Sequence, residues 1–409
     1  MVLARRVVQM DPRMPLLWAL VIVCLISLYD IYNGIQLFSA DNTASGTEGR
    51  GAGRGCYHKR SAESSEGHAD KSGNQLLTFA VVLCEGREET KNQDGSLGRQ
   101  LRQVKVLLKS VIVLTTSRIR FEIVTDSEEM YSSVVNSTLS WPQEYQQRLQ
   151  FGARRDVYYP RGSNELRHWW RECSTGRLFL HEIFNTTDAL IFLDTDIIFM
   201  QPPEYLWAEF GNFDVKQVVG EAPSVYVYSP AFKLFPTFGS TGVNNGVILM
   251  NLTRLREFPG GWSKSVLVVA YKYKNRLTLA DQDIVNIIFS REHSGRMYEL
   301  GCEWNVRPRV CSRSMNKCSG AASRGVAVLH GCSMTFMTDE ELRFRAVFEA
   351  WEQYDLRRPV RHLLRQLEAA LRATPKDGCG ILSNIDEILL KGFRKYVENI
   401  EPGTALPSG

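Results

Sequence analysis

The sequence has no large excess of charge of either sign and no dense block of Lys or Arg. Its 49 basic and 45 acidic residues leave a formal net charge of +4, which gives no support to nucleic-acid binding. No segment repeats at a fixed period, and 44% of the 409 residues are hydrophobic. Collagen-like, solenoid and mostly disordered chains are therefore excluded. The length is that of about two to three domains, or of one large enzyme domain with additions.

The sequence also lacks a clean small-x-small cleavage site after its N-terminal apolar segment, residues 15–38. That segment has about the length of a membrane-spanning helix. It follows Arg5, Arg6 and Arg13 and precedes Asp41, so the positive-inside rule places the N-terminus in the cytosol. We expect an uncleaved signal anchor, in preference to a cleaved signal peptide or a buried core helix.

Paired Cys-x-x-Cys motifs are missing, which argues against zinc even though Cys302, Cys311 and Cys318 lie close together in the chain. In an oxidising lumen we expect disulfide bonds, whose pairing stays open. Glycosylation sequons occur at Asn136, Asn185 and Asn251. These features agree with an extracytosolic location for most of the chain.

Residues 39–74 are rich in Gly, Ser, Ala and charge, and we interpret them as a flexible stem. From Leu76 onward, short apolar runs alternate with segments of helical periodicity, which favours a parallel α/β sheet. The expected strands are 76–83, 121–125, 189–193, 214–219, 246–250 and 326–329, and the expected helices are 100–110, 177–184 and 280–289. Beyond Phe344 we expect amphipathic helices with apolar faces that include Leu364, Leu367, Leu371, Ile385, Ile388 and Leu389.

Asp194-Thr195-Asp196 directly follows the buried run 189–193 and is the most informative motif. Ligands of open α/β sheets bind outside the carboxyl ends of the strands, and carboxylate oxygens suit magnesium or manganese. The motif alone also fits a solvated acidic pair at a strand end. It further resembles the nucleophile motif of haloacid-dehalogenase-type phosphatases. That motif lies on the first strand of its domain, whereas at least two strands are expected before Asp194.

Three further motifs strengthen the metal interpretation. Gly242 to Met250 enters a strand through a small polar turn that a ligand can approach closely. Asp281-Gln282-Asp283 opens a helical stretch, where Asp281 or Asp283 could equally be a simple N-cap. His330-Gly331 follows the last expected strand, although a lone His is more often structural.

Together these motifs resemble glycosyltransferase family 8, the retaining sugar-nucleotide transferases that include glycogenin and bacterial galactosyltransferases. Asp194-Thr195-Asp196, Asn244-x-Gly246-Val247, Asp281-Gln282-Asp283 and His330-Gly331 occur in the family's order over about residues 76–345. Segments 177–180, 271–275, 281–289, 302–308 and 328–331 further resemble the glucoside xylosyltransferases. Those enzymes transfer xylose from UDP-xylose to O-linked glucose on EGF-like repeats, notably of Notch.

The resemblance implies a GT-A type, Rossmann-like α/β domain with a mainly parallel sheet. The expected organisation is a cytosolic tail (1–14), a signal-anchor helix (15–38), a stem (39–74), a catalytic domain (75–345) and a helical C-terminal extension (346–409). It also implies a type II membrane protein of the endoplasmic reticulum or Golgi with a lumenal catalytic domain. The expected product is an α-1,3 xylosyl-glucose linkage. A glucosyl- or galactosyltransferase of the same family, or a non-catalytic sugar-binding protein of this fold, remains the alternative.

Residue by residue, the resemblance implies a manganese or magnesium ion on Asp194, Asp196 and His330. It assigns the uridine contact to Val82, Leu83 and Cys84 and a nucleotide contact to Arg177. The remaining donor-binding positions are Thr195, Asn244, Asn245, Asp281, Gln282 and Gly331. Asp281 and Gln282 are the expected catalytic residues, with the Gln282 carbonyl beneath the reacting sugar carbon. The sequence leaves a covalent intermediate and same-face attack both open. It departs from the family after Gly331, where the usual Lys is missing and the next cation is Arg343.

Overall fold

The computed structural model of the protein describes residues 76–85, 96–168, 173–224 and 235–402. The chain divides into two compact units, Met1–Glu63 and Ser64–Gly409, and all of the described residues belong to the second. The expected tail, anchor helix and stem lie outside the described residues. Within the described part of the chain, no helix is both long and apolar enough to cross a membrane.

A mixed sheet forms the centre of the second unit, with the strand order β3-β2-β1-β4-β7-β6-β8 among the described residues. Its strands are β1 (Leu76–Leu83), β2 (Arg118–Thr125), β3 (Leu149–Phe151), β4 (Ala189–Leu193), β6 (Val219–Pro223), β7 (Val243–Asn251) and β8 (Met297–Glu299). Only β7 runs antiparallel to its neighbours, so the sheet is mainly parallel, as expected. A separate antiparallel pair joins β5 (Ile197–Phe199) to β9 (Val328–His330).

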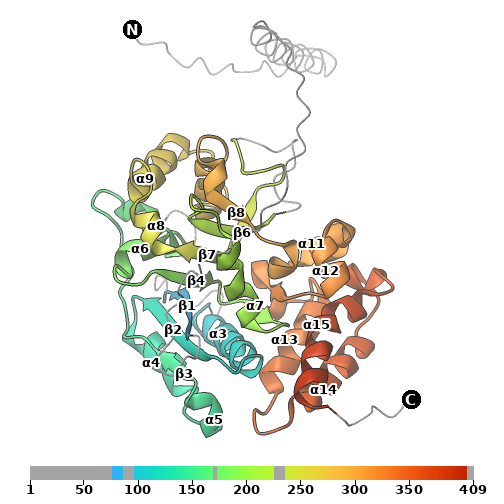
Figure 1. Ribbon diagram of the computed structural model, residues 1–409. Helices are drawn as coiled ribbons and strands as arrows, with labels where there is room; N and C mark the ends of the chain where they lie inside the picture. The colour runs from blue at the N-terminus through green and yellow to red at the C-terminus, as the bar shows by residue number, and fades with distance from the viewer. Residues whose placement is uncertain (1–75, 86–95, 169–172, 225–234, 403–409) are drawn as a thin grey trace, which may run out of the picture. The chain divides into compact units, whose positions relative to one another are not determined.

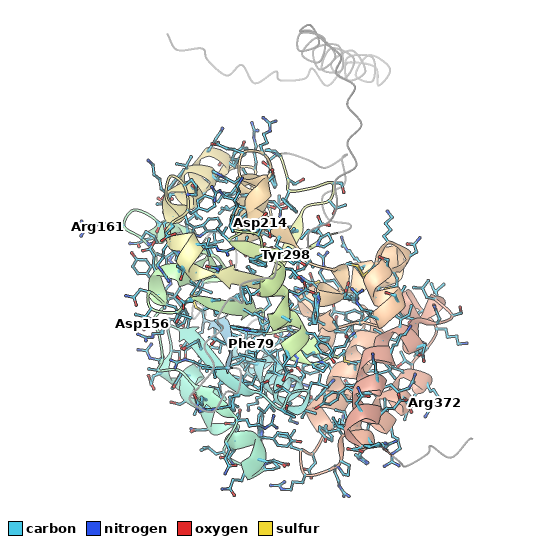
Figure 2. The ribbon with its side chains drawn as sticks, viewed as in Figure 1. Phe79, Asp156, Arg161, Asp214, Tyr298 and Arg372 are labelled. Atoms are coloured by element: carbon cyan, nitrogen blue, oxygen red, sulfur yellow. A yellow bond between two sulfur atoms is a disulfide. The ribbon has the colours of Figure 1, made fainter. Side chains whose placement is uncertain are left out.

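The strands are apolar on both sides, because helices cover both faces of the sheet. Two rows of paired residues cross β1, β4 and β7 on opposite faces: Phe79, Ile191 and Leu249 on one, and Ala80, Phe192 and Ile248 on the other. Figure 2 places Phe79 among these central strands. The long helix α3 (Ser96–Val113) forms the crossover that parallel pairing of β1 with β2 requires.

Helices α3, α13 (Leu342–Gln353), α14 (Val360–Ala373) and α15 (Ile385–Ile400) belong to the core on the first face. Helices α6 (Leu180–Ile183), α8 (Leu252–Arg256), α9 (Trp262–Tyr273) and α10 (Asp281–Ile288) cover the second. Figure 1 shows α13–α15 gathered on one side of the sheet and α6, α8 and α9 on the other. The other α-helices of the described residues are α4 (Glu128–Asn136), α5 (Gln143–Gln146), α7 (Pro203–Ala208), α11 (Pro308–Ser314) and α12 (Ser319–Arg324).

Short 3₁₀ helices supply many of the connections between these elements. They are η1 (Asn164–His168), η2 (Ser174–Phe179), η3 (Glu209–Asn212), η5 (Ser294–Arg296), η6 (Cys302–Asn305), η7 (Met315–Lys317), η8 (Cys332–Met337) and η9 (Gly378–Ile381).

Two expected elements differ in the structure. The strand predicted at 214–219 begins only at Val219, because Asp214 Oδ1 accepts hydrogen bonds from the backbone N–H groups of Lys216 and Gln217. This side-chain turn replaces strand pairing, and Asp214, labelled in Figure 2, is exposed. The helix predicted at 177–184 is instead η2 followed by the single turn α6, since Phe179 has non-helical torsions between them.

Three disulfides form in the described residues: Cys84–Cys173, Cys302–Cys318 and Cys311–Cys379. They confirm the preference for disulfides over zinc, and Cys332 is the free cysteine in this part of the chain. Cys311–Cys379 joins α11 to η9, and so fastens the C-terminal helices to the segment before β9. The predicted apolar faces of those helices are buried, with Leu364, Leu367, Leu371, Ile385, Ile388 and Leu389 each at most 6% exposed.

Candidate active site

Asp194 and Asp196 lie directly beyond the carboxyl end of β4. The Asp194 N–H still donates to the Gly246 carbonyl of β7 at 2.9 Å, so the first carboxylate is held at the sheet edge. The chain then turns into β5, whose Ile197 pairs with His330 at the end of β9. The Gly331 N–H donates to the Asp196 carbonyl at 2.8 Å. Long-range pairing of β5 with β9 therefore brings His330 to the acidic pair.

The three side chains offer a compact set of ligand atoms. One ligand atom each from Asp194, Asp196 and His330 lies within 4.8 Å of the others. His330 Nε2 is 3.6 Å from Asp194 Oδ2 and 3.4 Å from Asp196 Oδ1. Carboxylate oxygens suit magnesium and manganese, and a neutral imidazole is a common ligand of divalent metals. The arrangement fits a divalent ion.

Asn305 orients the histidine for such a role. Its Oδ1 atom can only accept, so the His330 Nδ1 atom at 2.9 Å carries the proton. The Nε2 lone pair then faces the two carboxylates, which is the usual arrangement for a metal-binding histidine. Asn305 is fixed in turn, because its Nδ2 group donates to the Asn244 backbone oxygen at 3.1 Å and to Asn244 Oδ1 at 2.8 Å. Sequence reasoning did not single out Asn305, although it lies in segment 302–308, which resembles the xylosyltransferases.

Gly246 lets the imidazole lie against the backbone of β7. A Cβ atom at this position would lie 2.2 Å from His330 Cε1, so any larger residue would displace the ring. The turn was expected to leave space for a ligand. In the structure the residue that approaches it is His330.

Arg177 links the acidic pair to the start of α10. Its guanidinium lies 2.8 Å from Asp194 Oδ1 and 3.3 Å from Asp281 Oδ2, over the Phe192 ring. Nη1 also donates to the Asn245 backbone oxygen at 3.1 Å. Burial lowers the pKa of Arg177, but Asp194 and Asp281 raise it more, and the net pKa lies above its usual value. The arginine is therefore a charged, largely buried link between the two carboxylates.

Asp281 is not the N-cap of α10. The capping position is Ala280, which makes no side-chain cap and has a φ of 43°, a strained value for a residue with a Cβ atom. Asp281 Oδ2 instead accepts from Asn245 Nδ2 at 3.2 Å. Burial raises the pKa of Asp281 to about 6, against the lowering effect of Arg177. Asp283 has a structural role at the start of the helix, because its Oδ2 atom accepts hydrogen bonds from the backbone N–H groups of Thr278 and Leu279.

Gln282 faces the β7 turn. Its Oε1 atom accepts from Asn244 Nδ2 at 2.5 Å, so the amide oxygen is held on the same side as Asn244. The helix itself is anchored by Asn286, which exchanges two hydrogen bonds with the Val243 backbone. The predicted apolar face packs into the domain, with Ile284, Ile287 and Ile288 at most 8% exposed. Polar side chains of α10 thus hydrogen-bond to the start of β7, while its isoleucines pack into the domain.

Glu221 on β6 is a buried acid that sequence reasoning missed. It is 1% exposed, and neither carboxylate oxygen has a hydrogen-bond partner among the described residues. Burial and the neighbouring Asp281 hold its pKa well above the usual range. Its signal in the sequence was a lone Glu inside the apolar run 218–222. Desolvation therefore favours the protonated form of Glu221 more than in a solvent-exposed glutamate.

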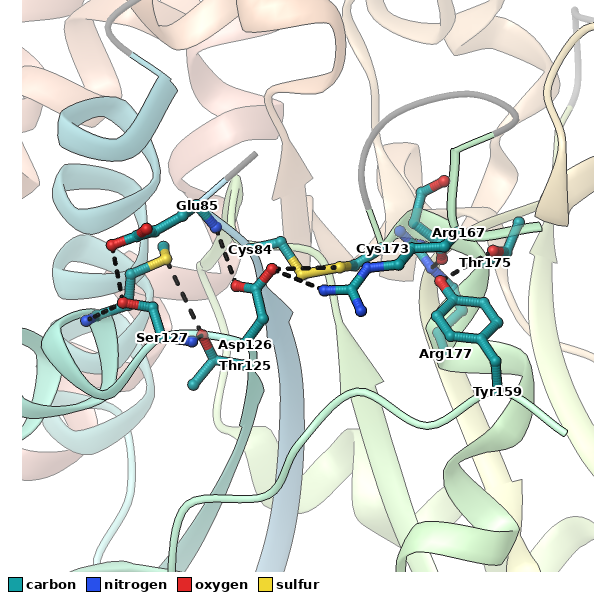
Figure 3. Close-up of a disulfide and its surroundings, with 12 residues drawn as sticks. Cys84, Glu85, Thr125, Asp126, Ser127, Tyr159, Arg167, Cys173, Thr175 and Arg177 are labelled. Carbon is teal, nitrogen blue, oxygen red and sulfur yellow. Dashed lines mark hydrogen bonds and ion pairs between the residues drawn. A yellow bond between two sulfur atoms is a disulfide. The ribbon is translucent and has the colours of Figure 1, made fainter. Parts of the chain in front are cut away.

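The end of β1 meets the segment that carries Arg177. Cys84 is disulfide-bonded to Cys173, and Asp126 beside them accepts from Arg167 at 3.0 Å and from the Glu85 N–H at 3.1 Å (Figure 3). Val82 is half-buried, whereas the Leu83 side chain is fully buried in the core. Of the expected uridine contacts, Leu83 can therefore offer only its backbone.

The structure thus brings most of the predicted residues into one connected set. Asp194, Asp196, His330, Arg177, Asn244, Asn245, Asp281 and Gln282 are joined by the contacts above. Thr195 faces away, because its hydroxyl contacts Gln103 Oε1 of α3 at 3.3 Å. The acidic pair also follows the fourth strand of the described residues, which argues against the phosphatase interpretation.

Comparison with known proteins agrees with this geometry. The model of glycosyl transferase family 8 matches residues 59–335. Glucoside xylosyltransferase 1 of Danio rerio is 34% identical over 344 residues, which cover 80% of each chain. Glucoside xylosyltransferase 2 of Mus musculus is 30% identical over 341 residues, which cover 78% of this chain and 73% of the relative. The crystal structure of an active-site mutant of LgtC aligns with a TM-score of 0.50 at 17% identity, over 75% of this chain and 100% of LgtC, and shows the shared fold.

Proposed function

The chain belongs to glycosyltransferase family 8, and on this premise we propose that it transfers xylose from UDP-α-D-xylose to O-linked β-glucose. The acceptor glucose is carried by EGF-like repeats of Notch-type glycoproteins, and the product linkage is α-1,3 with retention at the sugar carbon. The convergence of Asp194, Asp196 and His330 within 4.8 Å carries the proposal of an active enzyme. The choice of sugar and acceptor rests on the relatives that are named glucoside xylosyltransferases.

In this proposal Asp194, Asp196 and His330 hold a manganese or magnesium ion. The bound ion supplies Lewis-acid stabilisation of the diphosphate. Arg177 pairs with Asp194 and holds its carboxylate in place, and Asn305 keeps the His330 proton on Nδ1. Val82, Leu83 and Cys84 at the end of β1 lie at the uridine, and the Gly331 N–H holds the backbone of Asp196.

Asp281 and Gln282 act on the donor sugar. The Asp281 side chain accepts hydrogen bonds from sugar hydroxyls. The Gln282 amide oxygen, oriented by Asn244, lies beneath the reacting carbon and stabilises its developing positive charge. An amide is a poor nucleophile, so we favour same-face attack by the acceptor over a covalent intermediate.

The purified chain should be incubated with a panel of UDP-sugars and an O-glucosylated EGF-like repeat. We expect manganese-dependent release of UDP and a mass gain of one pentose, with UDP-xylose preferred. A preference for UDP-glucose or UDP-galactose would assign the chain to a hexosyltransferase of the same family. Absence of transfer despite binding of a UDP-sugar would instead favour a sugar-binding protein, and transfer that survives chelation would contradict the metal role.

We also propose that the protein is a type II membrane protein of the endoplasmic reticulum or Golgi. The apolar segment 15–38, its arginine-rich flank and three disulfides support an oxidising lumen. Protease added to intact microsomes should leave everything after about Phe38 protected. Digestion of residues 76–345 without detergent would contradict this topology.

A further inference from the structure

Arg307 is a buried cation, and the segment that carries it lies close to the ligands of the proposed ion. It is 5% exposed and follows Val306, which forms a parallel bridge with Leu329 of β9. The Val306 N–H donates to the Val328 carbonyl, and the His330 N–H donates to the Val306 carbonyl at 2.9 Å. The segment that carries Arg307 therefore lies directly beside the strand that ends in His330.

The backbone direction places Arg307 with Asn305. Val306 and Arg307 are both extended, with φ/ψ of −81°/116° and −109°/163°. Residues two apart in an extended chain project to the same side, and the Asn305 side chain reaches His330 Nδ1. The Arg307 side chain leaves on that side too, and its Nη2 group donates to the backbone oxygen of Ser224, just beyond β6.

The positive charges of the site only balance its own carboxylates, so the diphosphate of a bound nucleotide calls for a second cation. Asp194, Asp196 and Asp281 are the three carboxylates of the cluster, and Arg177 pairs with two of them. A divalent ion together with Arg177 balances these three negative charges and leaves no excess for the diphosphate of a UDP-sugar. That diphosphate carries two negative charges and gains a third when its bond to the sugar breaks. A further positive charge is needed at the leaving group.

The segment after Gly331 does not supply it. Residues 332–342 contain no Lys or Arg. Arg343, the next cation, is 2% exposed and donates to Asp386 of α15 at 2.8 Å and to the Pro375 carbonyl at 2.7 Å. Its guanidinium is therefore held among the C-terminal helices.

We propose that Arg307 is the second cation of the donor site and contacts the β-phosphate of the nucleotide sugar. As the bond between the sugar carbon and the β-phosphate oxygen breaks, its electron pair stays on the oxygen, and Arg307 stabilises the resulting charge. This inference rests on the proposed function and adds to it a residue that acts on the leaving group.

Calorimetric titration of UDP and of UMP, each with manganese, tests this role, because only UDP carries a β-phosphate. Arg307→Met should weaken UDP binding about ten- to a hundredfold, the effect of losing a charged hydrogen bond. UMP binding should change less than twofold, and Arg307→Lys should keep most of the preference for UDP. Arg309→Met is the matched control, since Arg309 is exposed two positions away, and it should bind both nucleotides like the wild type.

Equal weakening of UDP and UMP in a folded Arg307→Met protein, or no weakening of either, would overturn the proposal. Should that variant fail to fold, Arg307→Lys decides, and loss of its UDP preference would also overturn it. If the wild type and the Arg307 variants bind UDP equally well, only this inference is refuted. Wild-type protein that does not bind UDP with manganese refutes the proposed function as well.

Discussion

The sheet edge at β4 and the C-terminal helices α13–α15 bury opposite kinds of side chain. The helices bury leucines and aromatic residues such as Leu367, Trp351 and Phe393, while all of their Asp, Glu, Lys and Arg residues except Arg343 are at least partly exposed. The sheet edge buries Asp281, Gln282, Asn245, His330 and Glu221, whose desolvation costs free energy. Perturbed buried carboxyls of this kind are typical of functional sites. The difference indicates that the C-terminal helices serve stability and the sheet edge serves chemistry.

Loss of a metal ligand should have the largest effect on activity. Asp196→Asn removes a charge from the proposed ion site and should lower transfer by at least on the order of a thousandfold. The melting temperature should stay close to that of the wild type, because Asp196 is part of a repulsive acidic pair. Asp355→Asn, the same change at an exposed position in the C-terminal extension, is the control and should transfer normally. A comparable loss of transfer activity in both variants would contradict the distinction between the two regions.

A core truncation in the C-terminal helices should show the reverse pattern. Leu367 is fully buried, so Leu367→Ala should lower the free energy of unfolding by about 3 kcal/mol. Transfer per folded molecule should be unchanged at a temperature where the variant is folded. Ile381→Ala removes a similar side chain that is 76% exposed and should be nearly neutral. Urea unfolding and kcat measured in parallel check this, and a large fall in kcat for folded Leu367→Ala would tie these helices to the chemistry.

The buried carboxyl of Asp281 should make stability depend on pH. Burial raises its folded-state pKa from 3.8 to about 6. Arg177 lowers this pKa and Asp194 raises it further, and Glu221 lies close by. Between pH 4 and 6 the folded state holds a proton that the unfolded state has lost, so stability falls as pH rises through this window. The fall from this group is about 3 kcal/mol when complete.

Urea unfolding with chelator between pH 4 and 7 measures this dependence. The free energy of unfolding of Asp281→Asn should fall less across this pH window than that of the wild type, whatever the stability of the variant at pH 4. Parallel pH profiles of the two proteins would show that the carboxyl titrates normally in the folded state.

The smallest of these effects is expected at Gln282. Gln282→Ala should lower kcat about a hundredfold, equivalent to about 2.7 kcal/mol, because it removes a preorganised amide oxygen from the reacting carbon. UDP affinity and melting temperature should barely change. Gln143→Ala on the short helix α5 is a control far from the site in the chain. Near-normal turnover of Gln282→Ala, or a loss that follows unfolding, would contradict the role.

The parts that sequence reasoning predicted are those set by short-range patterns. The apolar run of β4, the acidic pair that follows it and the leucine spacing of α14 each specify local structure through periodicity. The prediction failed at 214–219, where a single Asp side chain replaced strand pairing with a turn. Asp281 and Asp283 looked alike as possible caps, and only the contact of Asp281 with Arg177 and Asn245 separates their roles.

Composition and local order along the chain established an α/β fold, an acidic strand end, disulfide chemistry and a helical C-terminal region. Tertiary structure decided which distant residues meet. His330 reaches Asp196 because β9 pairs with β5. Asn305 and Arg307 lie near His330 because their segment runs beside β9. The pairing of the cysteines depends on the same long-range arrangement. The physical reason is that hydrophobic periodicity acts over a few residues, whereas the site is assembled by strand pairing between segments far apart in the chain.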